Sequence, residues 1–288
     1  MGSDPRPRNE ETTMLAPNPA FTLPVVEALS VCKTYRNGTQ ALAPTDFSLA
    51  PGEFVSLIGP SGCGKSTLLK LVAGLIEPSD GRLQWWRQPT LLQGAQAPAG
   101  RRLAFVFQEA TLMPWASVEA NVRLPLDLQK VGKDEAEVRV AQALAKVGLS
   151  RYARHQPREL SGGMQMRVSI ARALVTEPDL LLMDEPFGAL DEITRNKLDE
   201  DLRQLWAEKG LSVVFVTHSV YEAAFLSSRV VVMAARPGRV FQEVSLNHAG
   251  PRDAAFRASP AFATTCRELS DLLLQASLVS GSDQLETA

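Results

Sequence analysis

Short runs of large apolar residues recur along the chain, and polar or turn-forming residues bound each of them. The runs are Val55–Ile58, Leu103–Phe107, Leu180–Met183, Val213–Val216 and Val230–Met233. Runs of this length, about four to eight residues, with few polar interruptions are typical of strands buried on both faces of a sheet. The pattern therefore predicts five interior strands.

Stretches with helical periodicity separate these runs. They are Lys65–Val72, Asp134–Val147, Met164–Val175 and Glu192–Lys209, the last of which places Leu198, Leu202, Leu205 and Trp206 on one face and stops before Gly210. The alternation of strands and helices predicts an α/β fold with a mostly parallel sheet. The segment Gln84–Arg102 does not fit this scheme, and its Gly, Pro and Gln content favours antiparallel β structure or loop.

The two ends of the chain follow other patterns. Residues 1–24 are rich in proline and poor in large apolar groups, so we expect a disordered leader. Residues 246–288 begin as a loop and continue as a helix with Phe262, Cys266, Leu269 and Leu273 on one face. We expect this extension to be too short for an independent regulatory domain.

Composition narrows the class of protein. The 288 residues suffice for about two domains or one large one. A net charge of −2 excludes a global basic field that would attract nucleic acid. No apolar run approaches the ~20 residues that span a bilayer. With three scattered cysteines, this composition is expected of a soluble intracellular chain.

The clearest chemical signal is a glycine-rich loop between a predicted strand and a predicted helix. It comprises Gly59, Pro60, Ser61, Gly62, Cys63, Gly64, Lys65 and Ser66, followed by Thr67. This is the P-loop pattern, in which backbone N–H groups surround phosphates, the lysine reaches the β- and γ-phosphates, and the serine hydroxyl suits Mg²⁺. We therefore expect ATP and Mg²⁺ to bind here, in preference to the alternative of a chance glycine-rich turn.

Cys63 lies inside this loop, close to Lys65 and to a helix N-terminus. Both positive groups favour a thiolate, so we expect a lowered pKa and an accessible, alkylatable thiol. The alternative is a thiol that is buried beneath the loop and unreactive.

Two carboxylates, Asp184 and Glu185, end the apolar run that begins at Leu180. The carboxyl ends of strands are where α/β folds bind ligands. Asp184 would hold Mg²⁺ through water, and Glu185 would act as general base on the attacking water. The alternative is a pair that only caps the following helix.

The stretch Leu160-Ser161-Gly162-Gly163-Met164-Gln165 resembles the signature motif of the ATP-binding cassette (ABC) ATPases. Ser161, Gly162 and Gly163 open a helix and offer a second set of N–H groups for an anion. The resemblance implies two chains arranged head to tail, in which each signature completes the ATP site of the other. The partner would be a second copy or a homologous ATPase subunit.

The resemblance covers residues 25–245 and implies a P-loop NTPase fold with an antiparallel β subdomain and a helical subdomain at about 109–163. It assigns Tyr35 to stacking on adenine, Gln108 to a Mg²⁺ ligand and link to the helical subdomain, and His218 to the γ-phosphate contact. Gly188–Asp191 is similar to the loop that crosses the dimer interface, which makes Asp191 a nucleotide-site residue. His155 and His248 have no matching position, and we expect them at the surface. Met166 and Ser219 depart from the residues common in the family.

Two stretches, Gln108–Val122 and Asp184–Asp191, look like the nitrate, sulfonate and taurine importer group. This implies transmembrane permease subunits as partners, an extracytoplasmic solute-binding protein as an indirect partner, and a peripheral place on the cytoplasmic face of the membrane. The alternatives are a subunit of a lipid-trafficking or export system and a soluble ABC-type ATPase acting on nucleic acid or ribosomes. We expect no nucleic-acid partner, because the balance of charge is acidic.

Movement at Gln108 can pass to whatever packs on the loop that follows it. We therefore expect the coupling surface in Glu109–Asn121, with Trp115 as its anchor. The alternative places Trp115 in the core of the helical subdomain.

Overall fold

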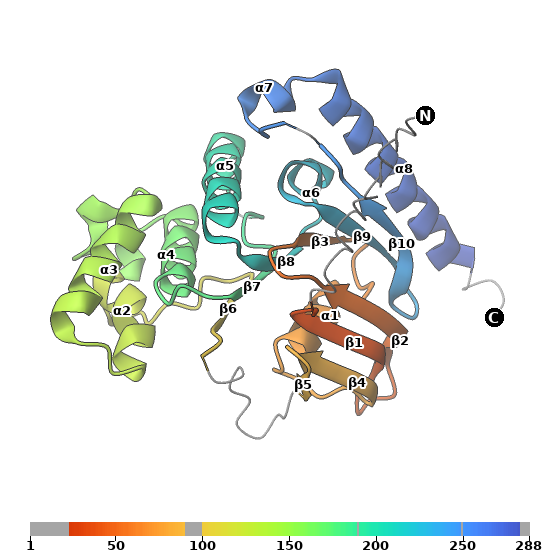
Figure 1. The fold of residues 1–288 in the computed structure, drawn as a ribbon, viewed down its shortest axis with the longest axis horizontal. Coiled ribbons are helices and arrows are strands. Elements are labelled where there is room, and N and C mark those ends of the chain that lie inside the picture. Colours follow the sequence, from red (N-terminus) through yellow and green to blue (C-terminus); the bar gives the residue numbers. More distant parts are fainter. Residues whose placement is uncertain (1–22, 90–99, 189, 249, 283–288) are drawn as a thin grey trace, which may run out of the picture.

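The computed structural model describes residues 23–89, 100–188, 190–248 and 250–282 (Figure 1). Nearly all of the leader predicted for residues 1–24 lies outside this part of the chain, as do Ala189 and a portion of the Gln84–Arg102 segment.

A six-stranded sheet with the order β10-β9-β3-β8-β7-β6 forms the centre of the described protein. Its strands are β3 (Phe54–Ile58), β6 (Leu103–Val106), β7 (Leu180–Asp184), β8 (Ser212–Val216), β9 (Arg229–Ala234) and β10 (Arg239–Ser245). The neighbours from β9 to β6 run parallel, and β10 pairs antiparallel with β9. The five predicted strands and the mostly parallel sheet are therefore confirmed.

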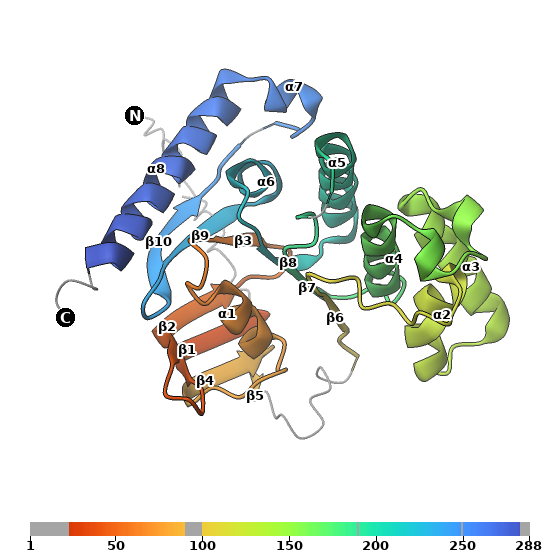
Figure 2. The ribbon, with the colours of Figure 1, turned by 180° about the vertical axis from the view of Figure 1, so that it is seen from behind.

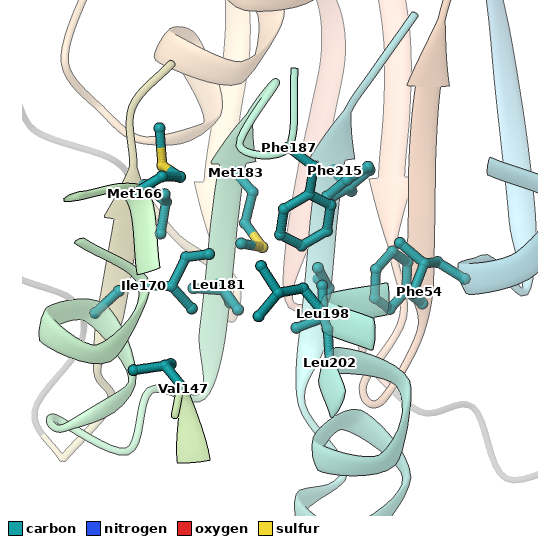
Figure 3. Close-up of a cluster of buried hydrophobic side chains, with 14 of the residues drawn as sticks. Phe54, Val147, Met166, Ile170, Leu181, Met183, Phe187, Leu198, Leu202 and Phe215 are labelled. Atoms are coloured by element: carbon teal, nitrogen blue, oxygen red, sulfur yellow. The ribbon is translucent and has the colours of Figure 1, made fainter. Parts of the chain in front are cut away.

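Both faces of this sheet are covered, which explains the uninterrupted apolar runs. On one face, Leu181 and Met183 of β7 pack against Leu198 and Leu202 of α5 (Glu192–Lys209) and residues of α4 (Gly162–Leu174), as Figure 3 shows. On the other face, Leu180 and Leu182 join the cluster around α1 (Lys65–Val72). Successive strand residues point to opposite faces, so a strand between two layers is apolar throughout.

A second, antiparallel sheet has the order β2-β1-β4-β5 and packs beside α1 (Figure 1). Its strands are β1 (Val26–Thr34), β2 (Gln40–Leu49), β4 (Asp80–Trp85) and β5 (Gln88–Pro89). The antiparallel unit is confirmed, but most of it precedes the P-loop, and the described part of Gln84–Arg102 supplies the end of β4 and all of β5. Trp85 Nε1 donates a hydrogen bond to Val72 O at 2.7 Å and so ties this sheet to α1.

The helices α2 (Val118–Leu128), α3 (Lys133–Lys146) and α4 pack on one another at the end of the molecule away from the C-terminal helix (Figure 2). Two 3₁₀ turns, Ser150–Tyr152 and Pro157–Glu159, connect α3 to α4. The sequence pattern predicts α3 and α4 but not α2, because Pro125 interrupts its helical signal.

The C-terminal segment continues from β10 into α7 (Ala254–Arg257) and the long helix α8 (Pro260–Ser282), which lies along β9 and α6 (Val220–Leu226). Phe262, Cys266 and Leu269 are buried as predicted, and Leu273 is half-buried against the same cluster. Across the described ranges, none of the helices combines the length and the apolar character that crossing a membrane requires.

Candidate functional site

The P-loop links the end of β3 to the start of α1 and is tightly confined. Gly64 has φ +88°, and a Cβ there would lie 2.7 Å from the carbonyl oxygen of Ala41. Gly238, at the turn between β9 and β10, also packs closely on the loop, because its Cβ would lie 2.5 Å from the carbonyl oxygens of both Cys63 and Ala41. Only glycine fits such approaches, so β2 and the β9–β10 turn fix the path of the loop.

Lys65 is buried within the loop it follows. Its ammonium donates hydrogen bonds to the carbonyl oxygens of Gly59 at 2.8 Å and Pro60 at 3.1 Å. A cavity of about 480 Å³ opens beside it, lined by Ala41, the P-loop residues from Gly59 to Thr67, Glu185 and His218. This cavity presents N–H groups at a helix N-terminus together with a cation, the combination that binds phosphate.

Ser66 and Asp184 meet at the floor of this region. The Ser66 hydroxyl donates a hydrogen bond to Asp184 Oδ1 at 2.8 Å. Burial raises the pKa of Asp184, and the bond from Ser66 offsets part of that rise. A hydroxyl and a buried carboxylate form the all-oxygen donor set that Mg²⁺ prefers, so these residues fit that ion.

Glu185 stands where β7 ends, with a left-handed backbone at φ +46°, and its N–H donates to Val216 O at 2.9 Å. Its Oε2 lies 3.4 Å from Gln108 Nε2 and 3.3 Å from His218 Nδ1. Non-glycine residues in this conformation cluster at functional sites. Three residues predicted for one site thus converge, although they follow three different strands.

The environment of Cys63 differs from the expected one. Its side chain is 0% exposed and belongs to the apolar cluster beneath the loop. Burial raises the pKa of the thiol, and the nearby Lys65 ammonium lowers it by less. The prediction of an accessible thiolate was wrong, because packing under the loop outweighs the positive charge beside it.

Tyr35 does not line the cavity, but its hydroxyl lies 3.5 Å from the Thr67 hydroxyl, which does. The ring is partly exposed, and the Lys33 ammonium lies 5.6 Å from its centroid. Tyr35 is therefore adjacent to the phosphate cavity through its hydroxyl, at the start of α1.

The second group of predicted residues lies apart from the cavity. Ser161 caps α4 by accepting from Met164 N at 3.3 Å, and Asp191 caps α5 by accepting from Thr194 N at 2.9 Å. The bond from Thr194 is the main cause that lowers the pKa of Asp191. Ser161, Gly162, Gly163 and Asp191 do not line the described cavity. They form a second helix-terminus region, joined by Gly163, whose Cβ would lie 2.7 Å from Leu190.

The loop after Gln108 is held rigidly. The Arg172 guanidinium of α4 donates to Thr111 O at 2.9 Å, and the buried Asn121 side chain accepts from Met113 N at 2.7 Å. Trp115 on this loop is 76% exposed, so the alternative of a core tryptophan is wrong. Sequence reasoning missed Arg172, Asn121, Ala41 and Gly238. Only Gly238 carried a local signal, as a glycine after proline in a hairpin turn.

The sequence is similar to those of known proteins over most of its length. The sequence profile described as ABC transporter matches residues 42–188. The taurine import ATP-binding protein of Rhizobium johnstonii is 44% identical over 244 residues, which are 83% of this chain and 91% of that protein. The aliphatic sulfonates import ATP-binding protein of Bacillus thuringiensis subsp. konkukian is 43% identical over 216 residues, 74% of this chain and 82% of that protein.

Solved structures agree with these relatives. A dimeric ATP-binding cassette in a post-hydrolysis state, bound to ADP and Pi, superposes with a TM-score of 0.70 at 34% identity and covers 77% of this chain and 99% of that chain. The fold and the P-loop cavity define a P-loop NTPase. The chain belongs to the ABC transporter family, as an ATP-binding subunit that hydrolyses ATP.

Proposed function

We propose that this chain is the energy-coupling subunit of an importer in which two copies, or a copy and a homologous subunit, bind two ATP molecules head to tail and drive a separate permease. The observation that carries the proposal is the split of the site residues into two groups. One group surrounds the phosphate cavity, and the other caps α4 and α5 outside it.

The first group would bind the nucleotide. The N–H groups of Gly59–Thr67 hold the phosphates, Lys65 turns from its carbonyl partners toward the β- and γ-phosphates, and Tyr35 stacks on adenine. Ser66, Asp184 and Gln108 would hold Mg²⁺, which would neutralise part of the phosphate charge when bound. The hydrogen bond between Ser66 and Asp184 supports this set, because it already aligns two of the oxygens.

Glu185 then serves as general base, accepting the proton of the attacking water on its carboxylate. His218 and Gln108, within 3.3 Å and 3.4 Å of Oε2, hold that oxygen from two sides. His218 contacts the γ-phosphate and restrains Glu185 at the same time. Positioning of this kind lowers the activation free energy of ATP hydrolysis, because the carboxylate needs no reorganisation before it accepts the proton.

The second group would act on the partner. Ser161, Gly162 and Gly163 at the N-terminus of α4 contact the γ-phosphate held by the other chain, and Asp191 lies at the crossing of the two chains. Helix N-termini bind anions through free N–H groups, which supports this role. The dimeric arrangement of the structural relative supports it too.

The permease would dock on Glu109–Asn121. Arg172 and Asn121 fix this loop to α4 and α2, so a shift at Gln108 moves the loop as one piece. Trp115, exposed at its tip, is the anchor. The chain then resides at the cytoplasmic face of the membrane through its permease, which in turn receives solute from an extracytoplasmic binding protein.

The transported solute is nitrate, taurine, a sulfonate or a similar small molecule. The names of the relatives at 44% and 43% identity support this choice. The test is to purify the tagged chain from membranes of its source, identify the permease that accompanies it, and reconstitute both with the cognate binding protein. We expect taurine, an alkanesulfonate or nitrate to stimulate ATP hydrolysis, with maltose as the negative control.

Other outcomes would contradict this assignment. Stimulation by lipid without any binding protein would favour the lipid-trafficking or export alternative. Recovery of the chain with ribosomes or nucleic acid and without a permease would favour the soluble alternative.

A further inference from the structure

Helix α6 begins two residues after His218, and the C-terminal segment contacts the other end of this helix. The Arg252 guanidinium donates to the carbonyl oxygens of Ala224 at 3.3 Å, Phe225 at 3.1 Å and Leu246 at 2.8 Å, and also to that of Ser227. The last carbonyls of a helix have no partner within the helix and attract cations. Figure 1 shows α6 enclosed between α5 and α8.

A second arginine of the same segment, Arg257 at the end of α7, binds α5. Its guanidinium donates to Asp199 Oδ2 at 3.0 Å and to Asn196 O at 3.3 Å, and it lies 3.5 Å from the centroid of the Phe225 ring of α6. Asp199 is 1% exposed, and its Oδ1 has no hydrogen-bond partner among the described residues. Burying a carboxylate costs free energy, which the ion pair with Arg257 offsets in part.

The network continues toward the active site through Arg195 and Glu222. Arg195 Nε lies 3.4 Å from Glu222 Oε1, and Arg195 stands one helical turn before Asp199 on α5. Glu222 is almost fully buried in α6 and accepts a hydrogen bond from the Thr217 hydroxyl. Two buried carboxylates and two arginines thus join α7, α5 and α6 in one cluster.

The cluster reaches Thr217 and Ser219, the residues on either side of His218 in the sequence. Thr217 Oγ1 accepts from Ser219 N at 2.9 Å, and Ser219 Oγ caps α6 by accepting from Glu222 N at 3.3 Å. Ser219, which departs from the residue common in the family, is therefore the N-cap of α6. His218, between these braced residues, projects toward Glu185.

We propose that Arg257 is a positioning residue for His218, acting through Asp199, Arg195 and Glu222 on the loop Thr217–Ser219. The short extension after β10 would then contribute to catalysis, although none of its described residues lines the phosphate cavity. This inference rests on the role proposed above for His218. Burial raises the pKa values of Asp199 and Glu222, and the arginines beside them offset part of each rise.

Histidine NMR of the full chain tests this directly, because the sequence has only three histidines. We expect Arg257→Ala to shift the imidazole signals of His218, identified by their loss in His218→Ala. It will also shift those of His248, whose ring stacks 4.2 Å from Phe256 beside Arg257, but not those of His155. Arg229→Ala is the matched control, because Arg229 binds Glu53 at 2.7 Å with a similar side-chain exposure, 14% against 16% for Arg257. It should leave the His218 signals in place.

Steady-state kinetics supply a second readout. Arg257→Ala should lower kcat for ATP about tenfold with KM unchanged, since small displacements of a catalytic group cost up to about 100-fold. Arg257→Lys, which keeps the ion pair with Asp199, should recover part of the loss and serves if the alanine variant does not fold. His218 signals that coincide with those of the wild type in folded Arg257→Ala would overturn the inference. Wild-type turnover in His218→Ala would instead contradict the catalytic role proposed for His218. The NMR result would still show whether Arg257 positions the His218 side chain.

Discussion

His218 Nδ1 lies 3.3 Å from Oε2 of Glu185, although 33 residues separate them in the sequence. The contact exists because β7 and β8 are neighbours in the sheet and end at the same edge. It places the general base proposed for hydrolysis beside a group that can hold its carboxylate in one orientation.

We expect Glu185→Gln to bind ATP normally and to hydrolyse it about 10²–10⁴ times more slowly, because the amide keeps the size of the carboxylate but accepts no proton. Equilibrium binding of ATP and single-turnover hydrolysis measure the two properties. Glu177→Gln is a suitable control, since the ion pairs of Glu177 within the described ranges are with the exposed Arg102 and Lys209, at 3.9 Å and 3.8 Å. Turnover near that of the wild type in Glu185→Gln would remove Glu185 from the mechanism.

Cys63 should react slowly with maleimide at neutral pH. Its thiol is buried beneath the P-loop, and burial raises its pKa, so little thiolate forms. Cys32, which is partly exposed, should be labelled first, while Cys266, whose pKa burial raises to about 11, stays unreactive. Mass spectrometry of partially labelled protein gives the order. Rapid labelling of Cys63 with loss of ATP binding would mean that the loop opens in solution.

Much of the fold was predictable because its strands and helices carry strong local signals. The range of α5, Glu192–Lys209, follows from Asp191 as N-cap and from Gly210, which takes the left-handed C-cap conformation at φ +62°. β1 and β2 were harder to find, because register shifts break their alternation of buried and exposed residues. α6 was missed because its seven residues are too few for a periodic pattern.

Some residues of the candidate site could likewise be predicted from the sequence, and others could not. The P-loop residues follow one another in the sequence, and so do Asp184 and Glu185, so each group forms a recognisable local pattern. The bond of Arg172 to Thr111 joins residues 61 positions apart, and no local pattern announces it. For Cys63, the sequence showed the neighbouring charges but not the apolar residues packed beneath the loop, and those residues decide its pKa.

We expect Trp115→Ala to leave basal ATP hydrolysis and thermal stability nearly unchanged, because substitutions at exposed positions usually alter stability by less than about 0.5 kcal/mol. Binding to the permease should weaken about 30-fold or more, as for the loss of a central interface anchor. Val138→Ala, at an exposed position of α3, is the control that should bind normally. A large drop in the melting temperature of Trp115→Ala would place the side chain in the fold and not at an interface.

Asp199 predicts a pH dependence of stability. Burial, and then the charge of Glu222, raise its pKa from 3.8 to about 7 and outweigh the Arg257 guanidinium. The folded state therefore binds more protons than the unfolded state between these values, so the free energy of unfolding falls as pH rises through this window. Asp199→Asn has no such titration. Urea unfolding of both proteins at several pH values from 4 to 8 should show the variant gaining stability relative to the wild type as pH rises; a pH-independent difference would contradict this.

The shared ATP site is the central claim, and light scattering of Glu185→Gln with ATP tests it most directly. We expect twice the chain mass with ATP and the single-chain mass without it. Adding Ser161→Arg should abolish the dimer while each chain still binds ATP, because the arginine obstructs only the partner's nucleotide. Ser259→Arg is the matched control: Ser259 Oγ accepts from Phe262 N at 3.2 Å near the start of α8, and this variant should still dimerise. A dimer that persists with Ser161→Arg, or a single-chain mass for Glu185→Gln in saturating ATP, would contradict the head-to-tail arrangement.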